Sequence, residues 1–175
     1  MSLLSSPSHA SIPMPARVLQ VNTSPGGVPK RAVAEARVGR EGLDGDAVNH
    51  PKVHGGPERA VCLFPVELIR RLQDEGHPVF PGSTGENLTV AGLEWPALEV
   101  DAVLAVGDEV RLQLTQRVEP CRTIAGSFEG GGFKRIQPKR APDETRWYAR
   151  VLTEGTVRPG DEVRVEATQA APAAG

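Results

Sequence analysis

The strongest candidate for chemistry in this sequence is Cys121, which follows a proline at the end of an alternating apolar stretch and lies between Arg117 and Arg122. Pro120 fixes its own φ and disfavours a helical conformation at Glu119, so we expect Cys121 on a stiff, extended segment. Nearby cations favour the thiolate, the form of cysteine that attacks electrophiles and binds metals. Two interpretations remain open on these residues alone: a reactive or metal-binding thiol, or a small buried hydrophobic side chain.

Further polar groups lie in three glycine-rich segments that interrupt the apolar stretches, at 42–57, 81–87 and 119–132. Long polar segments are uncommon inside a compact domain unless they have a function, and glycine N–H groups can hold an anion. His54, before Gly55 and Gly56, is either a donor to phosphate or a turn histidine bonded to backbone. Glu86 and Asn87 either contact the polar edge of a ligand or cap a turn.

Basic residues dominate the region from 127 to 150, which begins with a flexible Gly130-Gly131-Gly132. After these glycines only Asp143 and Glu144 oppose the basic residues. The basic residues are Lys134, Arg135, Lys139, Arg140, Arg146 and Arg150. A run of this kind is either the solvated face of a loop or an anion site for a phosphate or a charged cofactor tail.

Composition excludes several classes of protein. The chain has 175 residues, a net charge of -2, 39% hydrophobic and 24% charged residues, which suits one globular domain. A near-neutral charge argues against a dedicated nucleic-acid binder. Two cysteines make neither a disulfide framework nor a four-ligand zinc site. We interpret Cys62, inside the apolar run 60–64, as core packing, with a Cys62–Cys121 disulfide as the alternative.

No stretch of the sequence has the pattern of a signal peptide or the length of a membrane span. We therefore expect a cytoplasmic protein without a membrane or nucleic-acid partner. The Ser/Pro-rich residues 1–15 are interpreted as a disordered leader, and the Ala/Pro-rich residues 168–175 as a flexible tail. One domain at 16–167 is expected between them.

Hydrophobic patterning within that domain predicts a mostly β fold. Strands are expected at 16–22, 32–38, 60–64 and 88–90, and the region 102–118 carries the clearest strand pattern. One main α-helix is expected at 65–75, because Pro65 suits a first turn, Glu67 complements its positive end and Gly76 can end it. Two Gly-Asp turns, at 107–108 and 160–161, each precede an alternating strand. Together these features predict a β-barrel with turn-linked strands, one main helix and glycine-rich loops.

Five motifs in this order identify a family. They are Gly45-Asp46; His54-Gly55-Gly56-Pro57-Glu58-Arg59-Ala60-Val61; Pro81-Gly82 with Gly85-Glu86-Asn87-Leu88; Val106-Gly107-Asp108; and Arg117 with Pro120-Cys121. The set resembles the MOSC domain, named for the C-terminal domain of eukaryotic molybdenum-cofactor sulfurase. Trp147-Tyr148-Ala149-Arg150-Val151 and Gly160-Asp161 look like the stand-alone bacterial members. The resemblance covers about 16–167.

The resemblance implies a MOSC-type β-barrel with one essential cysteine, Cys121, at the mouth of a pocket for a molybdopterin-type molybdenum cofactor. In related enzymes this cysteine is proposed to ligate molybdenum, and some stand-alone relatives are linked to reduction of N-hydroxylated bases and amides. We expect Cys121 to be the metal ligand and the catalytic residue. The residues expected to hold the cofactor are His54, Gly55, Gly56, Arg59, Gly85, Glu86, Asn87, Arg117, Arg122, Lys134 and Arg135.

The sequence has no ferredoxin-like cysteine cluster and no pyridoxal-phosphate domain. A reductase of this kind is therefore expected to take electrons from a partner reductase. The alternative is a sulfur carrier with a persulfide on Cys121, loaded by a cysteine desulfurase, or a module that delivers the cofactor. A third possibility is a barrel that only mediates protein contacts.

Overall fold

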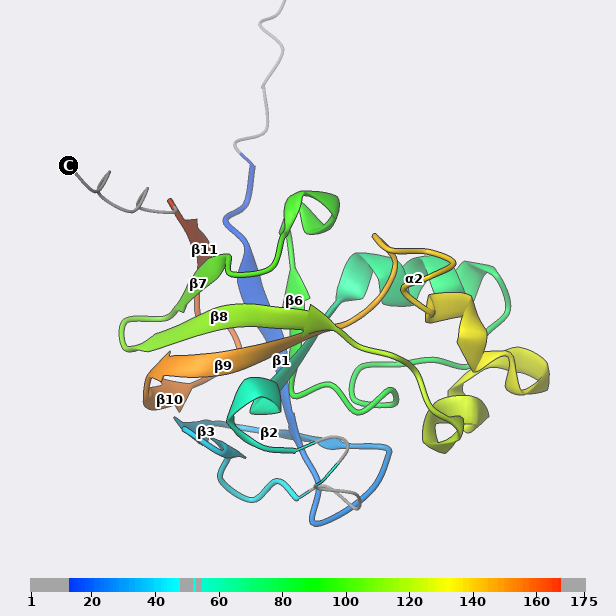
Figure 1. The fold of residues 1–175 in the computed structure, drawn as a ribbon, viewed down its shortest axis with the longest axis horizontal. Helices are drawn as coiled ribbons and strands as arrows, with labels where there is room; N and C mark the ends of the chain where they lie inside the picture. Colours follow the sequence, from blue (N-terminus) through cyan, green and yellow to red (C-terminus); the bar gives the residue numbers. More distant parts are fainter. Residues whose placement is uncertain (1–12, 48–51, 53–54, 168–175) are drawn as a thin grey trace, which may run out of the picture.

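The computed structural model describes residues 13–47, 52 and 55–167. Most of the expected leader, the expected tail and His54 lie outside the described residues. The described part consists of short strands, several 3-10 turns and one main α-helix (Figure 1). The mostly β fold with one main helix is thus confirmed. None of the helices that the structure describes has the length and apolar character needed to cross a bilayer.

The main helix is α2 (Val66–Asp74), which begins and ends within one residue of the predicted segment. The 3-10 turns are η1 (Pro57–Arg59), η2 (Trp95–Ala97), η3 (Arg122–Ser127), η4 (Glu129–Gly131) and η5 (Phe133–Ile136). The strands are β1 (Arg17–Thr23), β2 (Arg31–Val33), β3 (Ala36–Gly39), β4 (Gly42–Leu43), β5 (Val61–Pro65), β6 (Leu88–Ala91), β7 (Val103–Val106), β8 (Val110–Arg117), β9 (Trp147–Thr153), β10 (Gly155–Val157) and β11 (Val163–Glu166).

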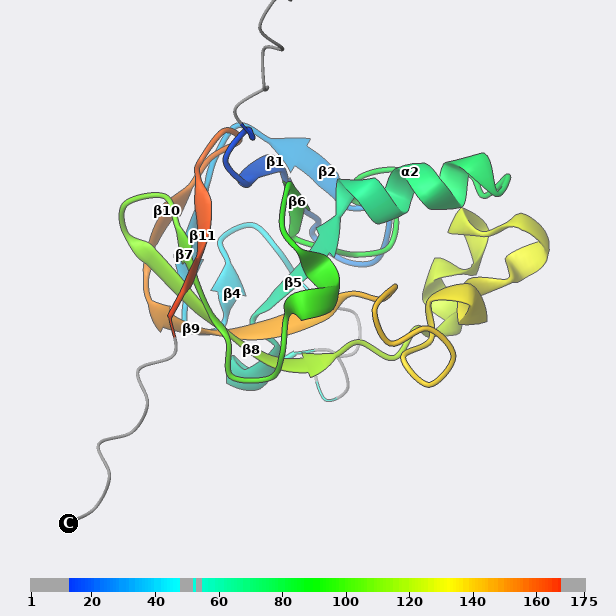
Figure 2. The same cartoon turned by 90° about the horizontal axis from the view of Figure 1, so that it is seen from above.

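The strands form two sheets that curve around a common interior (Figure 2). The larger sheet has the order β11-β7-β8-β9-β5-β6-β1-β2, and the smaller one the order β10-β3-β4. Neighbouring strands of the larger sheet pair antiparallel, except β5 and β6, which run parallel. The start of β1 meets the segment at 160–163 through one isolated bridge, Arg17 to Glu162. Three backbone hydrogen bonds of 2.8 Å join the same segments: Val18 N to Asp161 O, Gly160 N to Val18 O and Val163 N to Ala16 O.

The predicted barrel needs one correction, because these sheets do not close. β2 occupies the second edge of β1 at Val21–Thr23, so only the first residues of β1 are left for the segment at 160–163. The ladder between β1 and β11 is therefore too short to continue the larger sheet into a ring.

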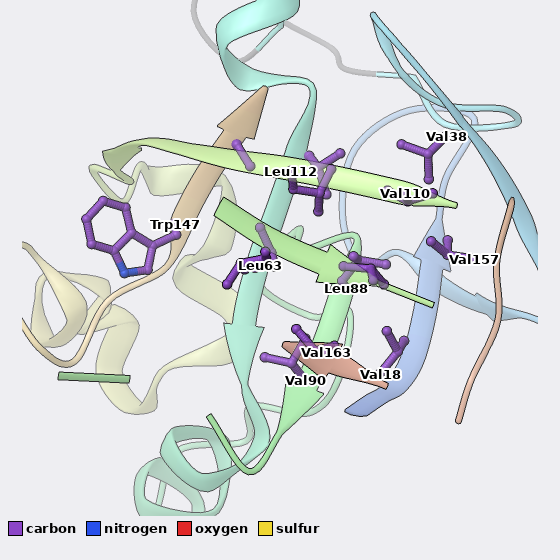
Figure 3. Close-up of a cluster of buried hydrophobic side chains, with 14 of the residues drawn as sticks. Val18, Val38, Leu63, Leu88, Val90, Val110, Leu112, Trp147, Val157 and Val163 are labelled. Carbon is purple, nitrogen blue, oxygen red and sulfur yellow. The ribbon is translucent and has the colours of Figure 1, made fainter. Parts of the chain in front are cut away.

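The main hydrophobic core fills the interior between the strands (Figure 3). Because side chains alternate along a strand, every second residue of β5 and β9 points into it. In β5 these are Val61 and Leu63, and in β9 they are Trp147, Ala149 and Val151. The residues between them face the other side of the sheet.

The other side of the sheet is covered by α2 and the 3-10 turns after β8 (Figures 1 and 2). Phe64 of β5 packs there with Leu72 of α2 and with Phe128 and Ile136 of the turns. Arg135 links the same elements, because its guanidinium bonds Glu75 at 2.7 Å and Glu144 at 2.6 Å. This second layer places the segment that begins at Cys121 against the outer face of the sheet.

Two predicted segments differ from the observed elements. The predicted strand at 32–38 is two strands, β2 and β3, which belong to different sheets because the chain turns between Val33 and Ala36. The central strand β9 was not predicted, because its arginines were interpreted as part of a basic loop. Arg146 and Arg150 in fact alternate with the buried Trp147 and Ala149 in the period-two pattern of a strand.

Gly82 offers a test of the loop that precedes β6. It adopts φ 90°, and a Cβ added there would lie 2.3 Å from the backbone oxygen of Lys30. Gly76 is a matched control, since it has φ 94° and nothing within 4 Å of an added Cβ. We expect Gly76→Ala to lower the unfolding free energy by about 1 kcal/mol. Gly82→Ala should cost about 1–3 kcal/mol more, because two backbone groups must separate.

Urea unfolding of both variants measures this difference. Equal losses for the two variants would contradict the close packing of this loop on Lys30.

Candidate functional site

A pocket of about 350 Å³ lies against the face of the sheet that is turned away from the main core. This volume is in the range of small-molecule sites, which is about 300–1,000 Å³. Side chains of β5 and β9 form part of its wall, and loops from distant parts of the sequence form the rest. The contributing segments are 27–30, 41–47, 55–62, 84–87, 121–124 and 146–148.

Cys121 lies on the wall of this pocket, after the end of β8 and directly before η3. Its backbone is extended, with φ -119° and ψ 168°, which agrees with the conformation expected after Pro120. Val118 donates to the carbonyl oxygen of Arg146 at 3.0 Å, so the pairing of β8 with β9 holds the segment nearly up to the cysteine. The Cys121 thiol is free and only partly buried, so a ligand in the pocket can reach it.

Cys62 lines the same pocket from strand β5, but its chemistry differs. It is a free thiol, 5% exposed, in a small cluster with Val118 and Tyr148. Burial raises its pKa to about 11, so this side chain remains a neutral thiol near neutral pH. Cys62 is therefore a buried, packed side chain that forms part of the pocket wall. Cys121 is the accessible thiol of the pair.

Tyr148 lies directly opposite Cys62 in the β5–β9 ladder and also lines the pocket. Burial raises the pKa of Tyr148, and the sulfur of Cys62 acts in the same direction, whereas the charges of Arg146 and Arg59 lower it. The tyrosine hydroxyl thus lies within electrostatic reach of both arginines, and it stays protonated.

Arg146 directly precedes β9 and faces the same side of the sheet as Tyr148, two residues further on. The residue is 6% exposed and lines the pocket. Its Nη1 donates a hydrogen bond to the carbonyl oxygen of Thr84. Its Nε is buried without a hydrogen-bond partner in the described part of the chain.

A buried polar network holds the loops that form the opposite part of the wall. Asp46 is its centre: Oδ2 accepts bonds from Lys30 Nζ at 2.5 Å and Asn87 Nδ2 at 2.8 Å, and Oδ1 accepts one from the Ser24 amide at 2.9 Å. The Asn87 Oδ1 in turn accepts the amide of Cys62 at 3.0 Å. Removing one partner of a buried ion pair is strongly destabilising, so this network fixes the positions of the loops around the pocket.

Six of the predicted site residues line the pocket: Gly55, Gly56, Arg59, Gly85, Asn87 and Cys121. His54 lies outside the described residues. Asn87 uses its amide group within the network around Asp46, so its contribution is to position neighbouring groups.

Glu86 is fully buried and is absent from the pocket wall. Its carboxyl accepts bonds from the Gly82 amide at 2.6 Å, Thr84 Oγ1 at 2.7 Å and Thr89 Oγ1 at 3.1 Å. Burial raises the pKa of this carboxyl. Glu86 therefore organises the loop before β6, and its predicted contact with the cofactor finds no support in this placement.

Four predicted basic residues also lie away from the pocket wall. Arg117 stacks on Trp147, with its Cζ 4.4 Å from the ring centroid, and donates to the Pro142 carbonyl oxygen. Arg135 is held by its two carboxylate partners, and the side chains of Arg122 and Lys134 are exposed to solvent. The basic run therefore serves mostly as a surface, and within it Arg146 is the residue that faces the pocket.

The wall residues that the sequence-based prediction left out of the site include Tyr148, Lys30 and Asp46. The alternation of Arg146, Tyr148 and Arg150 with apolar residues was the available signal for Tyr148. Lys30 carries no local signal, because its role depends on a contact with Asp46 across the fold.

The two cysteines should differ sharply in reactivity. At a pH of about 8, iodoacetamide is expected to alkylate Cys121 in the folded protein and to leave Cys62 largely unmodified. The thiolate fraction of Cys62 is lower than in the unfolded chain by about a hundredfold, because its pKa is about 11 rather than 9.0. Peptide mass spectrometry gives both rates, with urea-unfolded protein as the control. Equal rates for both cysteines in the folded state would contradict the assignment of Cys121 as the accessible thiol.

Comparison with known proteins places this architecture in a family. The model of the MOSC domain matches residues 50–164. The chain is 36% identical to the uncharacterized protein YflK of Bacillus subtilis over 137 residues, which cover 77% of this chain and 60% of YflK. It is 27% identical to the protein YiiM of Escherichia coli over 148 residues, covering 79% of this chain and 64% of YiiM. The chain thus spans less than two thirds of the length of either relative.

Among solved structures, YiiM from Geobacillus stearothermophilus superimposes with a TM-score of 0.67 and 23% sequence identity. The match covers 87% of this chain and 76% of that one. At this identity the structural likeness concerns the fold, which agrees with the family match in sequence. This chain belongs to the MOSC domain family.

Proposed function

We propose that this protein binds a molybdopterin-type molybdenum cofactor in the pocket and that Cys121 is the ligand that the chain gives to the metal. The observation that carries the proposal is the Cys121 thiol, which is free, partly exposed and on the wall of a pocket of about 350 Å³. Membership of the MOSC family, whose name derives from molybdenum-cofactor sulfurase, supports this choice of cofactor.

The donor set of the pocket fits a cofactor that brings most of its own metal ligands. In the part of the chain that the structure describes, no three His, Cys, Asp or Glu side chains come together as a metal site. Cys121 offers one soft sulfur ligand, and the neutral Cys62 is a poor second one. Such a site suits a metal already bound by the dithiolene sulfurs of a pterin better than a bare ion.

Several wall residues can hold the organic part of the cofactor. Gly55, Gly56 and Gly85 leave room for a ligand to approach the backbone, because they have no side chain. Arg59 adds a positive charge at η1, and Tyr148 offers a hydroxyl that stays protonated. The network around Asp46 keeps these loops in place without contributing a free charge, since Lys30 neutralises the carboxylate.

We further propose that the loaded protein reduces N-hydroxylated bases or amides. In that reaction the N–O bond of the substrate breaks, two electrons and two protons are taken up, and an amine or amide and water are released. The bound cofactor supplies the two-electron redox chemistry, and a partner reductase supplies the electrons. The pocket residues bind and orient the substrate, and the Tyr148 hydroxyl can donate a hydrogen bond to its oxygen.

A second candidate function is supported by the exposure of Cys121. A partly exposed thiol can be reached by a protein that donates sulfur, so Cys121 can carry a persulfide for delivery to another enzyme. The same geometry suits a module that hands a bound cofactor to a partner.

Metal analysis separates these functions. The wild-type protein, Cys121→Ala and Cys62→Ala are expressed in a host that makes the cofactor, and molybdenum and pterin are quantified after purification. We expect both in the wild type and in Cys62→Ala, whereas Cys121→Ala should lose most of its molybdenum because the ligand from the protein is gone. With a reductase, the wild type should then reduce an N-hydroxylated base.

Two results would contradict this proposal. If the wild type contains no molybdenum but gains a reducible sulfur on Cys121 after incubation with a cysteine desulfurase, the protein is a sulfur carrier. If Cys121→Ala keeps the molybdenum content of the wild type, Cys121 is not the ligand.

A further inference from the structure

A buried arginine with no ion-pair partner among the described residues lines the pocket. Arg146 is 6% exposed, and no ion pair among the described residues includes it. A guanidinium has five N–H donors, of which the structure pairs one, through Nη1, with the carbonyl oxygen of Thr84. Burial of a charged group is costly unless the group is paired, so this arginine calls for a further partner.

Glu86 is a buried carboxyl that acts electrostatically on Arg146. It is not the ion-pair partner that Arg146 lacks. Its two oxygens accept bonds from Gly82, Thr84 and Thr89, and no ion pair joins it to the arginine. Burial raises the pKa of Glu86, whereas its hydrogen bonds and the charge of Arg146 lower it. The carboxyl oxygens are thus engaged by the loop before β6, and no donor of Arg146 is paired with them among the described residues.

The side chain of Arg146 lies on the pocket side of the sheet. Its Nε is buried without a hydrogen-bond partner in the described residues, and the side chain forms part of the pocket wall next to Tyr148. A guanidinium can bind an oxyanion through two parallel N–H groups, which makes arginine well suited to such a ligand.

We propose that Arg146 is the binding residue of an oxyanion subsite in the inner wall of this pocket, and that the group it takes is a phosphate monoester. The charges on the wall favour an anionic ligand. Lys30, Arg59 and Arg146 are cationic and Glu41 and Asp46 are acidic, so the formal sum of the wall is one positive charge. The buried Lys30–Asp46 pair cancels itself.

Two ligands of this pocket can carry such a phosphate: the tail of a pterin cofactor, or an N-hydroxylated substrate that is a nucleotide. Assigning the phosphate to either ligand rests on the proposed function, whereas the subsite itself does not. Its test therefore uses inorganic phosphate and protein without cofactor, in which Cys121 plays no part.

Titration calorimetry with inorganic phosphate measures the subsite in four metal-free proteins. Wild type, Cys121→Ala and Arg135→Gln are expected to bind phosphate with the same affinity, because the anion needs neither the thiol nor an arginine outside the pocket. Arg146→Gln should bind it about 10- to 100-fold more weakly, the loss expected for a hydrogen bond to a charged group. Failure of the molybdenum proposal would leave these four results unchanged.

Arg146→Met guards against a folding defect in the glutamine variant, because it keeps the side-chain volume and removes the buried charge. Without phosphate its melting temperature should equal or exceed that of the wild type. Phosphate should raise the melting temperature of the wild type but not that of Arg146→Met. A merely structural arginine, which anchors Thr84, predicts a lower melting temperature for both variants and no response of the wild type to phosphate. Wild-type protein that does not bind phosphate, or an Arg146→Met variant that binds it equally well, would overturn the proposal.

Cofactor-loaded wild-type protein then distinguishes the two sources of the phosphate. If the cofactor occupies the subsite, the loaded protein no longer binds inorganic phosphate. If the subsite belongs to the substrate, the loaded protein still binds phosphate, and it prefers an N-hydroxylated nucleotide to the free base in a manner that depends on Arg146. Both results support the oxyanion subsite.

Discussion

The antiparallel pairing of β5 with β9 fixes both sides of the sheet at once. Val61, Leu63, Trp147 and Ala149 must point into the interior, where the main hydrophobic core excludes water. With a side-chain period of two, the residues between them have to face the other way, and a register slip of one residue would exchange the two sets. The core therefore determines that Cys62, Arg146 and Tyr148 share one face and form one wall of the pocket.

The rest of the site is brought to this wall by polar contacts rather than by apolar packing. Asp46 joins Lys30, Ser24 and Asn87, and so connects the turn after β1, the segment after β4 and the loop before β6. Cys121 arrives from the opposite side, on the extension of β8 that is paired with β9. The accessible thiol of Cys121 and the side chains that this network holds in place are the groups that a ligand in the pocket would meet. This arrangement is compatible with the cofactor binding proposed above.

Local patterns in the sequence predicted the helix, most of the strands and the placement of Cys121 on an extended segment, but they missed β9 and merged β2 with β3. α2 was found because its caps and its apolar spacing are properties of neighbouring residues. The site was only partly accessible to such reasoning. Arg135 and Arg117 looked like anion-binding residues, but Glu75 and Trp147 engage them in the folded chain. Arg146 belongs to the same basic run and lacks such a partner, a difference that depends on contacts between distant segments.

The central claim is that Cys121 ligates the molybdenum of a cofactor bound in the pocket. Locating the metal itself tests this claim most directly. Crystals of the cofactor-loaded wild-type protein would be measured on both sides of the molybdenum absorption edge, so that the anomalous difference map marks the metal alone. The account predicts one strong peak in this pocket, within bonding distance of Cys121 Sγ and not bonded to Cys62. A molybdenum peak elsewhere on the protein, or one in the pocket that does not contact Cys121, would contradict it.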